Sequence, residues 1–119
     1  MSTRRQVLII TAAAALCAAG PALAQQSIKI GINVERTGVA SSYGTHMLIA
    51  ARIATEEVNR AGGINGAKLE LVVEDNRSSP EQAVIVTRNL ERQNVFAMLG
   101  PIQTTQCRTA FPAANRAML

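Results

Sequence analysis

Hydrophobic residues along the chain recur with periods that alternate between strand and helix. Every second position is an isoleucine at Ile28, Ile30 and Ile32, which is the period of two typical of a strand. From about Ser42 the period becomes helical, with the apolar positions Met47, Leu48, Ala51, Ala54 and Val58. The Gly62-Gly63 pair is expected to end this helix, because glycine tolerates the left-handed conformation of a helix end.

A second strand, a second helix and a third strand follow. Leu69 to Glu74 is nearly continuously apolar, as expected of a parallel strand covered on both faces. Ser79 is a candidate N-cap for the next helix, with Pro80 at its first position and Gln82 placed for the return hydrogen bond of a capping box. We expect that helix to end near Asn94, and we expect Val95 to Leu99 to form the third strand.

A third helix is predicted after the polar segment Gln103 to Gln106. Pro112 is expected to kink or shorten it, because proline lacks the N–H group that a helix interior requires. Strands that alternate with helices predict an α/β fold, here a partial doubly wound parallel sheet with strand order 2-1-3.

This topology predicts where a ligand would bind. In such sheets ligands lie beyond the carboxyl ends of the strands where the strand order switches, here between the first and third strands. The loops Thr37 to Tyr43 and Gly100 to Thr105 are therefore expected to face one crevice. Thr104 and Thr105 precede the third helix, whose free N–H groups and dipole favour an anion such as a carboxylate. The residues alone are equally consistent with two threonines that only cap the helix.

Residues 1–24 have the features of an export signal, with cleavage expected after Ala24. Arg4 and Arg5 precede the apolar run Val7 to Ala19, which is too short to span a bilayer, and Ala22 to Ala24 has the small-x-small pattern of a cleavage site. We therefore expect a periplasmic protein, exported by the general secretory route, with the twin-arginine route left open. Cys17 follows Leu16 rather than a small residue, so lipoprotein anchoring is not favoured.

The expected mature chain has 95 of the 119 residues, and its net charge falls from +4 to +2 without Arg4 and Arg5. Both signs of charge are interspersed and only 3% of the residues are aromatic, so nucleic acid is not an expected partner. Cys107 is the single cysteine after cleavage, which excludes an internal disulfide. It is expected to be a half-buried helical residue.

The chemistry of an enzyme has little support in this sequence. His46 is the only histidine, and the adjacent pairs Glu56-Glu57 and Glu74-Asp75 point their members in different directions. The Gly-x-Gly-x-x-Gly phosphate fingerprint is absent from the sequence, as is any metal-ligand spacing. We therefore expect neither catalysis nor a cofactor nor a metal site.

Residues 27 to 116 resemble the N-terminal part of the periplasmic leucine/isoleucine/valine-binding proteins, the receptors of branched-chain amino-acid ABC transporters. The order and spacing of several short segments carry this resemblance. They are Ile28 to Gly31, Thr37-Gly38, Tyr43-Gly44, Glu56 to Asn59, Ala61 to Gly63, Gly66 to Asp75 and Leu99 to Pro101. Two departures are Val34-Glu35, where the family often has Gly-Pro, and Ala50, where it often has glycine.

The resemblance implies a type I periplasmic-binding-protein lobe, a clamp of two lobes that closes on an amino acid or a related small solute, and a membrane permease as partner. It also implies that Tyr43 lines the side-chain pocket and that Thr104 holds the ligand carboxylate, with Thr105 as a second candidate. The ligand itself stays open.

Residues 25–119 are expected to form the N-terminal part of the first lobe, incomplete, with an unpaired edge at the third strand and no useful affinity alone. Two alternatives to a transporter receptor remain at this point. They are the ligand-sensing lobe of a regulator or receptor, and an inactive exported fragment.

Overall fold

The computed structural model describes residues 27–119, and the signal predicted at residues 1–24 lies outside them. Three parallel strands form the sheet: β1 (Ser27–Val34), β2 (Lys68–Asp75) and β3 (Ala97–Leu99). The strand order is β2-β1-β3, which confirms the predicted 2-1-3 topology. β1 is therefore the central strand, paired with β2 over its whole length and with β3 from Ile30 to Ile32.

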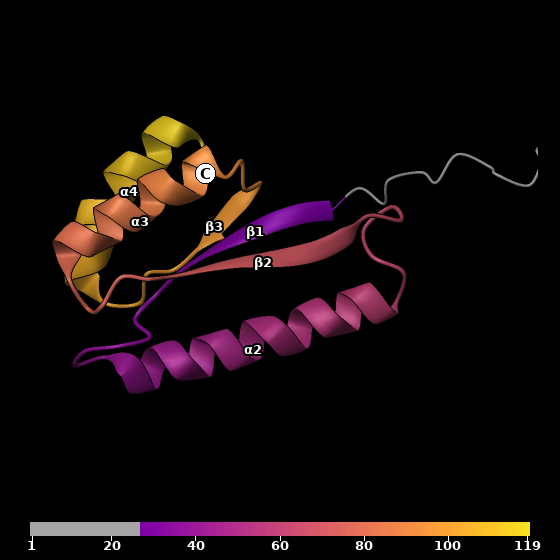
Figure 1. The fold of residues 1–119 in the computed structure, drawn as a ribbon, viewed down its shortest axis with the longest axis horizontal. Coiled ribbons are helices and arrows are strands. Elements are labelled where there is room, and N and C mark those ends of the chain that lie inside the picture. Colours follow the sequence, from indigo (N-terminus) through magenta and orange to yellow (C-terminus); the bar gives the residue numbers. More distant parts are fainter. Residues whose placement is uncertain (1–26) are drawn as a thin grey trace, which may run out of the picture.

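Helices cover both faces of this sheet (Figure 1). α2 (Ser41–Arg60) runs below the sheet in that view, whereas α3 (Pro80–Arg92) and α4 (Thr104–Ala117) lie above it. This arrangement of layers follows from right-handed connections between parallel strands. Within residues 27–119, no helix has the length and hydrophobicity needed to cross a bilayer.

The best-packed core lies between α3 and the sheet. Val86 and Leu90 of α3 are buried with Val95, and Val72, Met98 and Leu119 pack against them. Gly31 of β1 faces this helix, since a Cβ there would lie 3.0 Å from Leu90 Cδ1. Gly31 and Asn33 therefore face α3, whereas Ile30 and Ile32 lie on the α2 side of the sheet.

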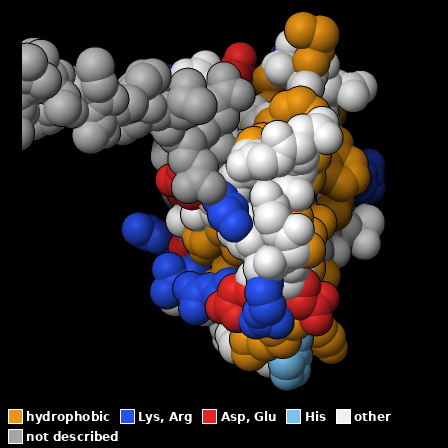
Figure 2. Space-filling view, turned by 90° about the vertical axis from the view of Figure 1, so that its right-hand side faces the viewer, with side chains coloured by type: hydrophobic (Ala, Val, Ile, Leu, Met, Phe, Trp, Pro, Cys, Tyr) orange, Lys and Arg blue, Asp and Glu red, His pale blue; other side chains and the backbone are white. Residues whose placement is uncertain are grey.

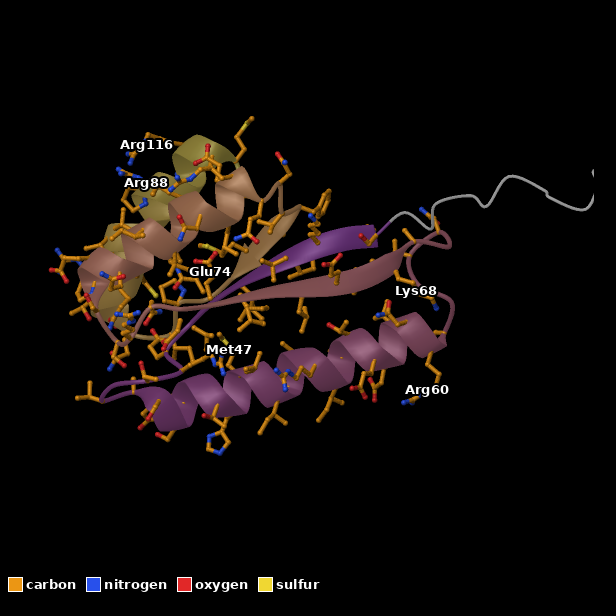
Figure 3. The ribbon with its side chains drawn as sticks, in the orientation of Figure 1. Met47, Arg60, Lys68, Glu74, Arg88 and Arg116 are labelled. Carbon is orange, nitrogen blue, oxygen red and sulfur yellow. The ribbon has the colours of Figure 1, made fainter. Side chains whose placement is uncertain are left out.

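The end of α2 is fastened to the start of β2 by one asparagine. Asn59 Oδ1 accepts from the backbone N–H of Leu69 at 2.7 Å, and Asn59 Nδ2 donates to Leu69 O at 2.9 Å. Lys68 Nζ also donates to the backbone oxygen of Asn59, and Figure 3 places Lys68 above the last turn of α2. These bonds give a structural role to an asparagine within one of the segments that carry the family resemblance.

Three local expectations are corrected. β3 spans Ala97–Leu99 rather than Val95 to Leu99, because Asn94 turns the chain with a φ of 54° and Val95 then packs into the core. Pro112 does not shorten α4, which continues to Ala117, buries Ala110, Ala113 and Ala114, and packs against α3.

The third correction concerns the start of α3. Ser79 is its N-cap, as expected, and its hydroxyl oxygen accepts from the Gln82 N–H at 3.3 Å. The Ser79 hydroxyl donates to Glu81 Oε2 at 2.7 Å, and this hydrogen bond lowers the pKa of Glu81. Among the hydrogen bonds of residues 27–119, none returns from the Gln82 side chain. Ser79 therefore caps the helix without the reciprocal bond of a capping box.

Candidate ligand site

The loops after β1 and β3 meet at the carboxyl end of the sheet, held together by Glu35. Its side chain is fully buried, with 0% of its surface exposed. The backbone N–H groups of Ile102 and Gln103 donate to its carboxylate, at 3.1 and 3.4 Å from Oε1. Glu35 precedes the predicted loop Thr37 to Tyr43, so these hydrogen bonds bring the start of the β1–α2 connection against the predicted loop Gly100 to Thr105.

Glu35 occupies the position just ahead of α4. A buried carboxylate requires hydrogen-bond donors, and the start of a helix is rich in N–H groups that have no partner within the helix. The protein thus places a carboxylate of its own beside the helix start for which the sequence left an anion site as one of two interpretations. Sequence reasoning noted Glu35 only as a departure. Its position after the apolar end of β1 was the signal that it turns inwards.

Asp75, the last residue of β2, fixes the loop that follows β1. Its carboxylate accepts from the backbone N–H groups of Arg36, Thr37 and Arg77 at 2.8–3.2 Å and from the Thr37 hydroxyl at 2.7 Å. Partial burial alone would raise the pKa of Asp75, but these hydrogen bonds outweigh it and the pKa is lowered. Asp75 is therefore a structural anchor in its ionised form.

Glycines allow the elements at this end of the sheet to approach closely. A Cβ on Gly44, in the first turn of α2, would lie 2.1 Å from the Glu35 backbone oxygen. A Cβ on Gly100 would lie 2.2 Å from Asn33 O and 3.1 Å from Met47 Cε. Met47 projects from α2 into the space below the sheet in Figure 3. Neither glycine tolerates a side chain, so both set the position of the loops.

A buried polar network also joins these strand ends to α3. Asn33 Nδ2 donates to Ala83 O at 2.9 Å and to Thr87 Oγ1 at 3.1 Å, and Asn76 Nδ2 donates to Asn33 Oδ1 at 2.9 Å. All three side chains of this network, those of Asn33, Asn76 and Thr87, are buried. Satisfied buried polar groups favour one arrangement of the loops over others.

The three predicted site residues lie at this end of the molecule. Tyr43 lies in the first turn of α2 with 65% of its side chain exposed. Thr104 and Thr105 are the first two residues of α4 and are also exposed. The N-cap residue is Gln103, without a side-chain cap, and the Thr105 hydroxyl donates to Gln106 Oε1. The alternative in which the two threonines cap α4 is therefore not what the structure shows.

Thr105, but not Thr104, lines a hollow between the starts of α3 and α4. The other lining residues are Pro80, Arg108 and Thr109. Tyr43 belongs to α2, on the other face of the sheet. The first intrahelical hydrogen bond of α4 is donated by the N–H of Cys107 to Gln103 O, so the N–H groups of its first turn precede the helical ladder.

Comparison with known proteins assigns the fold to a family. Residues 27–118 match the family model described as "Periplasmic binding protein", which is most of the chain. The chain belongs to this family. A relative from Pseudomonas aeruginosa, the "Leucine-, isoleucine-, valine-, threonine-, and alanine-binding protein", is 32% identical over 91% of this chain and 29% of its own length.

Solved structures of periplasmic binding proteins share the fold. The isoleucine complex of the branched-chain amino acid transporter substrate binding protein LivJ from Streptococcus pneumoniae has a TM-score of 0.76 and 39% identity, over 77% of this chain and 27% of its own. A fatty acid ABC transporter substrate-binding protein from Thermomonospora curvata has a TM-score of 0.72 and 30% identity, over 82% and 25% respectively. This chain therefore spans less than a third of the length of these relatives.

Proposed function

We propose that residues 25–119 are the N-terminal part of the ligand-binding lobe of an extracytoplasmic solute-binding protein, which serves an ABC transporter for branched-chain amino acids or related small solutes. The observation that carries this proposal is the family match over residues 27–118, together with the relatives named for amino-acid binding. In this role the chain binds a solute and does not transform it. Residues 1–24 would export it, and a membrane permease would be its partner.

Within this lobe, Tyr43 and Thr104 are the proposed ligand contacts, with Thr105 as a second candidate on the helix. All three are exposed at the carboxyl end of the sheet, where ligands bind in doubly wound folds. The N–H groups of the first turn of α4 would donate hydrogen bonds to the negative end of a ligand, and the helix dipole favours that charge by roughly 0.3–1 kcal/mol. Tyr43 offers an aromatic surface to the apolar part of the same ligand.

The ligand class that fits this geometry is a small solute with one carboxylate. Amino acids and fatty acids, which the matched proteins are named for, share that group and differ in everything attached to it. Glu35 limits where this carboxylate can bind, because its own carboxylate already accepts from the N–H groups of Ile102 and Gln103. A ligand carboxylate is therefore expected further along, at the amides of Thr104 and Thr105, since like charges repel.

A titration of residues 25–119 followed by backbone amide NMR tests this assignment. Millimolar leucine should shift the amides of Thr104 and Thr105, whereas leucinamide, which lacks the carboxylate, should leave them in place. A Thr104→Val variant should weaken the response, while Asn115→Ala, at an exposed position near the other end of the same helix, should not. Shifts that are equal for leucine and leucinamide, or that avoid the start of α4, would contradict the proposed site.

A further inference from the structure

The connection between α2 and β2 contains the one Asn-Gly pair of the sequence, Asn65-Gly66. Ile64 and Ala67 exchange two backbone hydrogen bonds across this pair, at 2.8 and 2.9 Å, and form an isolated antiparallel bridge. Asn65 and Gly66 have φ values of 50° and 85°. A positive φ at both central residues is typical of a type I′ turn, for which Asn-Gly is a preferred sequence.

This turn leaves the backbone nitrogen of Gly66 accessible. Both central residues are exposed, and a Cβ placed on Gly66 would meet no atom within 4 Å. Among the hydrogen bonds of residues 27–119, none is donated by the Gly66 N–H. Glycine also adds no side chain that would shield this nitrogen from the side-chain amide of Asn65, the residue before it.

The chain is held on both sides of the turn. The Gly63 N–H donates to Val58 O at 2.9 Å, and the Leu69 N–H donates to Asn59 Oδ1 at 2.7 Å. Figure 1 shows this connection at the end of the molecule away from the starts of α2 and α4. Figure 2 faces that end and shows charged side chains of both signs gathered in its lower part. Water therefore reaches the turn, and opening it breaks only the two hydrogen bonds between Ile64 and Ala67.

We propose that Asn65 is a modification site, where the side-chain amide is lost without an enzyme and aspartate and isoaspartate are formed. The Gly66 nitrogen bonds to Cγ of Asn65 and closes a succinimide ring. The bond from Cγ to the side-chain nitrogen breaks, and that nitrogen leaves as ammonia with the proton of the Gly66 N–H. Water then opens the ring. Breaking the bond from the Gly66 nitrogen to Cγ gives aspartate, and breaking its bond to the main-chain carbonyl carbon gives isoaspartate.

The two products differ in their effect on the turn. Aspartate leaves the length of the backbone unchanged, whereas isoaspartate adds one carbon to the main chain between Ile64 and Ala67. The two hydrogen bonds that close the turn require the geometry of two central residues, so isoaspartate breaks them. The Leu69 N–H still donates to Asn59 Oδ1, so the start of β2 stays in place. The change is confined to the connection, and the proposal is independent of the ligand contacts.

The test incubates residues 25–119, the expected mature chain, in mildly alkaline buffer in which circular dichroism shows the chain to be folded. Trypsin then releases residues 61–68, in which Asn65 is the one asparagine. This peptide should gain the mass difference between an amide and an acid, and it should separate into two isomers. The folded chain should react within about tenfold of the rate of the same chain in urea, because only the turn has to open. Retention of the amide in the folded chain while the unfolded chain converts would overturn the proposal.

Asn94 is a matched control within the same chain. It is exposed and has a φ of 54°, much like Asn65, but the residue that follows it is Val95. The branched side chain of Val95 crowds the attacking nitrogen, so conversion at Asn94 should be at least about tenfold slower. The tryptic peptide of residues 93–108 reports this rate. Equal rates at the two asparagines would overturn the assignment to the Asn-Gly turn.

Hydroxylamine and two variants test the intermediate and its product. Hydroxylamine attacks a succinimide and splits the chain there, so it should cut the folded parent between Asn65 and Gly66. Asn65→Gln lengthens the side chain and should abolish this cut. Asn65→Asp keeps the normal backbone and should leave the amide resonance of Ala67 in place, whereas the isoaspartate fraction of the parent should shift it. An uncut parent, an equally cut Asn65→Gln variant, or an unshifted Ala67 amide in the isoaspartate fraction would contradict the proposal.

Discussion

The carboxylate of Glu35 accepts a hydrogen bond from the backbone N–H of Ile102, 67 residues further along the chain, at 3.1 Å. This contact joins the loop after the central strand to the loop that leads into α4. The proposed ligand contacts lie on the helices that follow these two loops. Glu35 therefore links the two halves of the proposed site without being exposed to a ligand.

Replacing Glu35 should measure the strength of this link. Glu35→Ala leaves two partly buried N–H groups without this partner and should lower the free energy of unfolding by about 1–3 kcal/mol. Glu35→Gln keeps one accepting oxygen and should cost less. Urea unfolding of both variants, with the exposed Glu91→Ala as control, checks this. A Glu35→Ala variant as stable as Glu91→Ala would show that the hydrogen bonds contribute nothing.

Cys107 should be a slow nucleophile. Burial raises the pKa of its thiol, and the negative charge of Glu35 raises it further. At neutral pH iodoacetamide should therefore alkylate Cys107 more slowly than a free cysteine. Glu35→Gln removes the negative charge, which lowers the thiol pKa and should speed alkylation. The pH dependence of the alkylation rate reports both effects, and identical profiles would place Glu35 too far away to act.

The lowered pKa of Asp75 predicts that acid reduces the contribution of this residue to stability. Its pKa is lower in the folded chain than the ordinary value of 3.8, because hydrogen bonds to the ionised carboxylate outweigh its burial. The stability it contributes is thus complete above its unfolded pKa and is lost as the pH falls through the lower folded pKa. Asp75→Asn should be less stable than the parent at pH 6, and the difference should shrink towards pH 2.5. Glu56→Gln, an exposed position on α2, serves as the control in urea unfolding at both pH values. A constant difference would contradict the assigned role.

Replacing Gly44 by alanine should destabilise the protein, which is the opposite of the usual effect inside a helix. Replacing glycine by alanine inside a helix ordinarily stabilises a protein by roughly 0.5–1 kcal/mol. Here the added Cβ would meet the Glu35 backbone oxygen at 2.1 Å, so Gly44→Ala should destabilise by about 1–3 kcal/mol. Ser42→Ala, at an exposed position of the same helix, should have little effect. Thermal unfolding of both variants decides, and a stabilised Gly44→Ala would contradict the close approach.

The periodic features of the sequence were sufficient to predict the order of helices and strands and the topology of the sheet. Alternating isoleucines, a helical period after Ser42 and the Ser79-Pro80 start predicted the elements and the strand order, because each reflects local preference and burial together. β3 was placed two residues too early because Val95 and Phe96 have the side chains of a strand. Asn94, with a positive φ, delays the start of pairing.

The inner contacts of the site could not be read from periodicity. The hydrogen bonds of Glu35 to Ile102, and of Asn33 to Asn76 and Thr87, join residues far apart in the chain, and their side chains look like surface residues in the sequence. Burial of a charged or amide side chain depends on donors supplied by distant backbone, which single-sequence patterns do not show. Tyr43, Thr104 and Thr105 remain predictions as ligand contacts.

The most direct test of the central claim is a chimera in which residues 27–118 replace the matching segment of the Pseudomonas aeruginosa relative, with leucine binding measured by calorimetry. If this chain is the N-terminal part of a solute-binding lobe, the folded chimera should bind leucine, and Thr104→Val should weaken binding by about tenfold, as expected for one lost hydrogen bond to a charged group. A folded chimera that binds neither leucine nor any other small carboxylate would contradict the account.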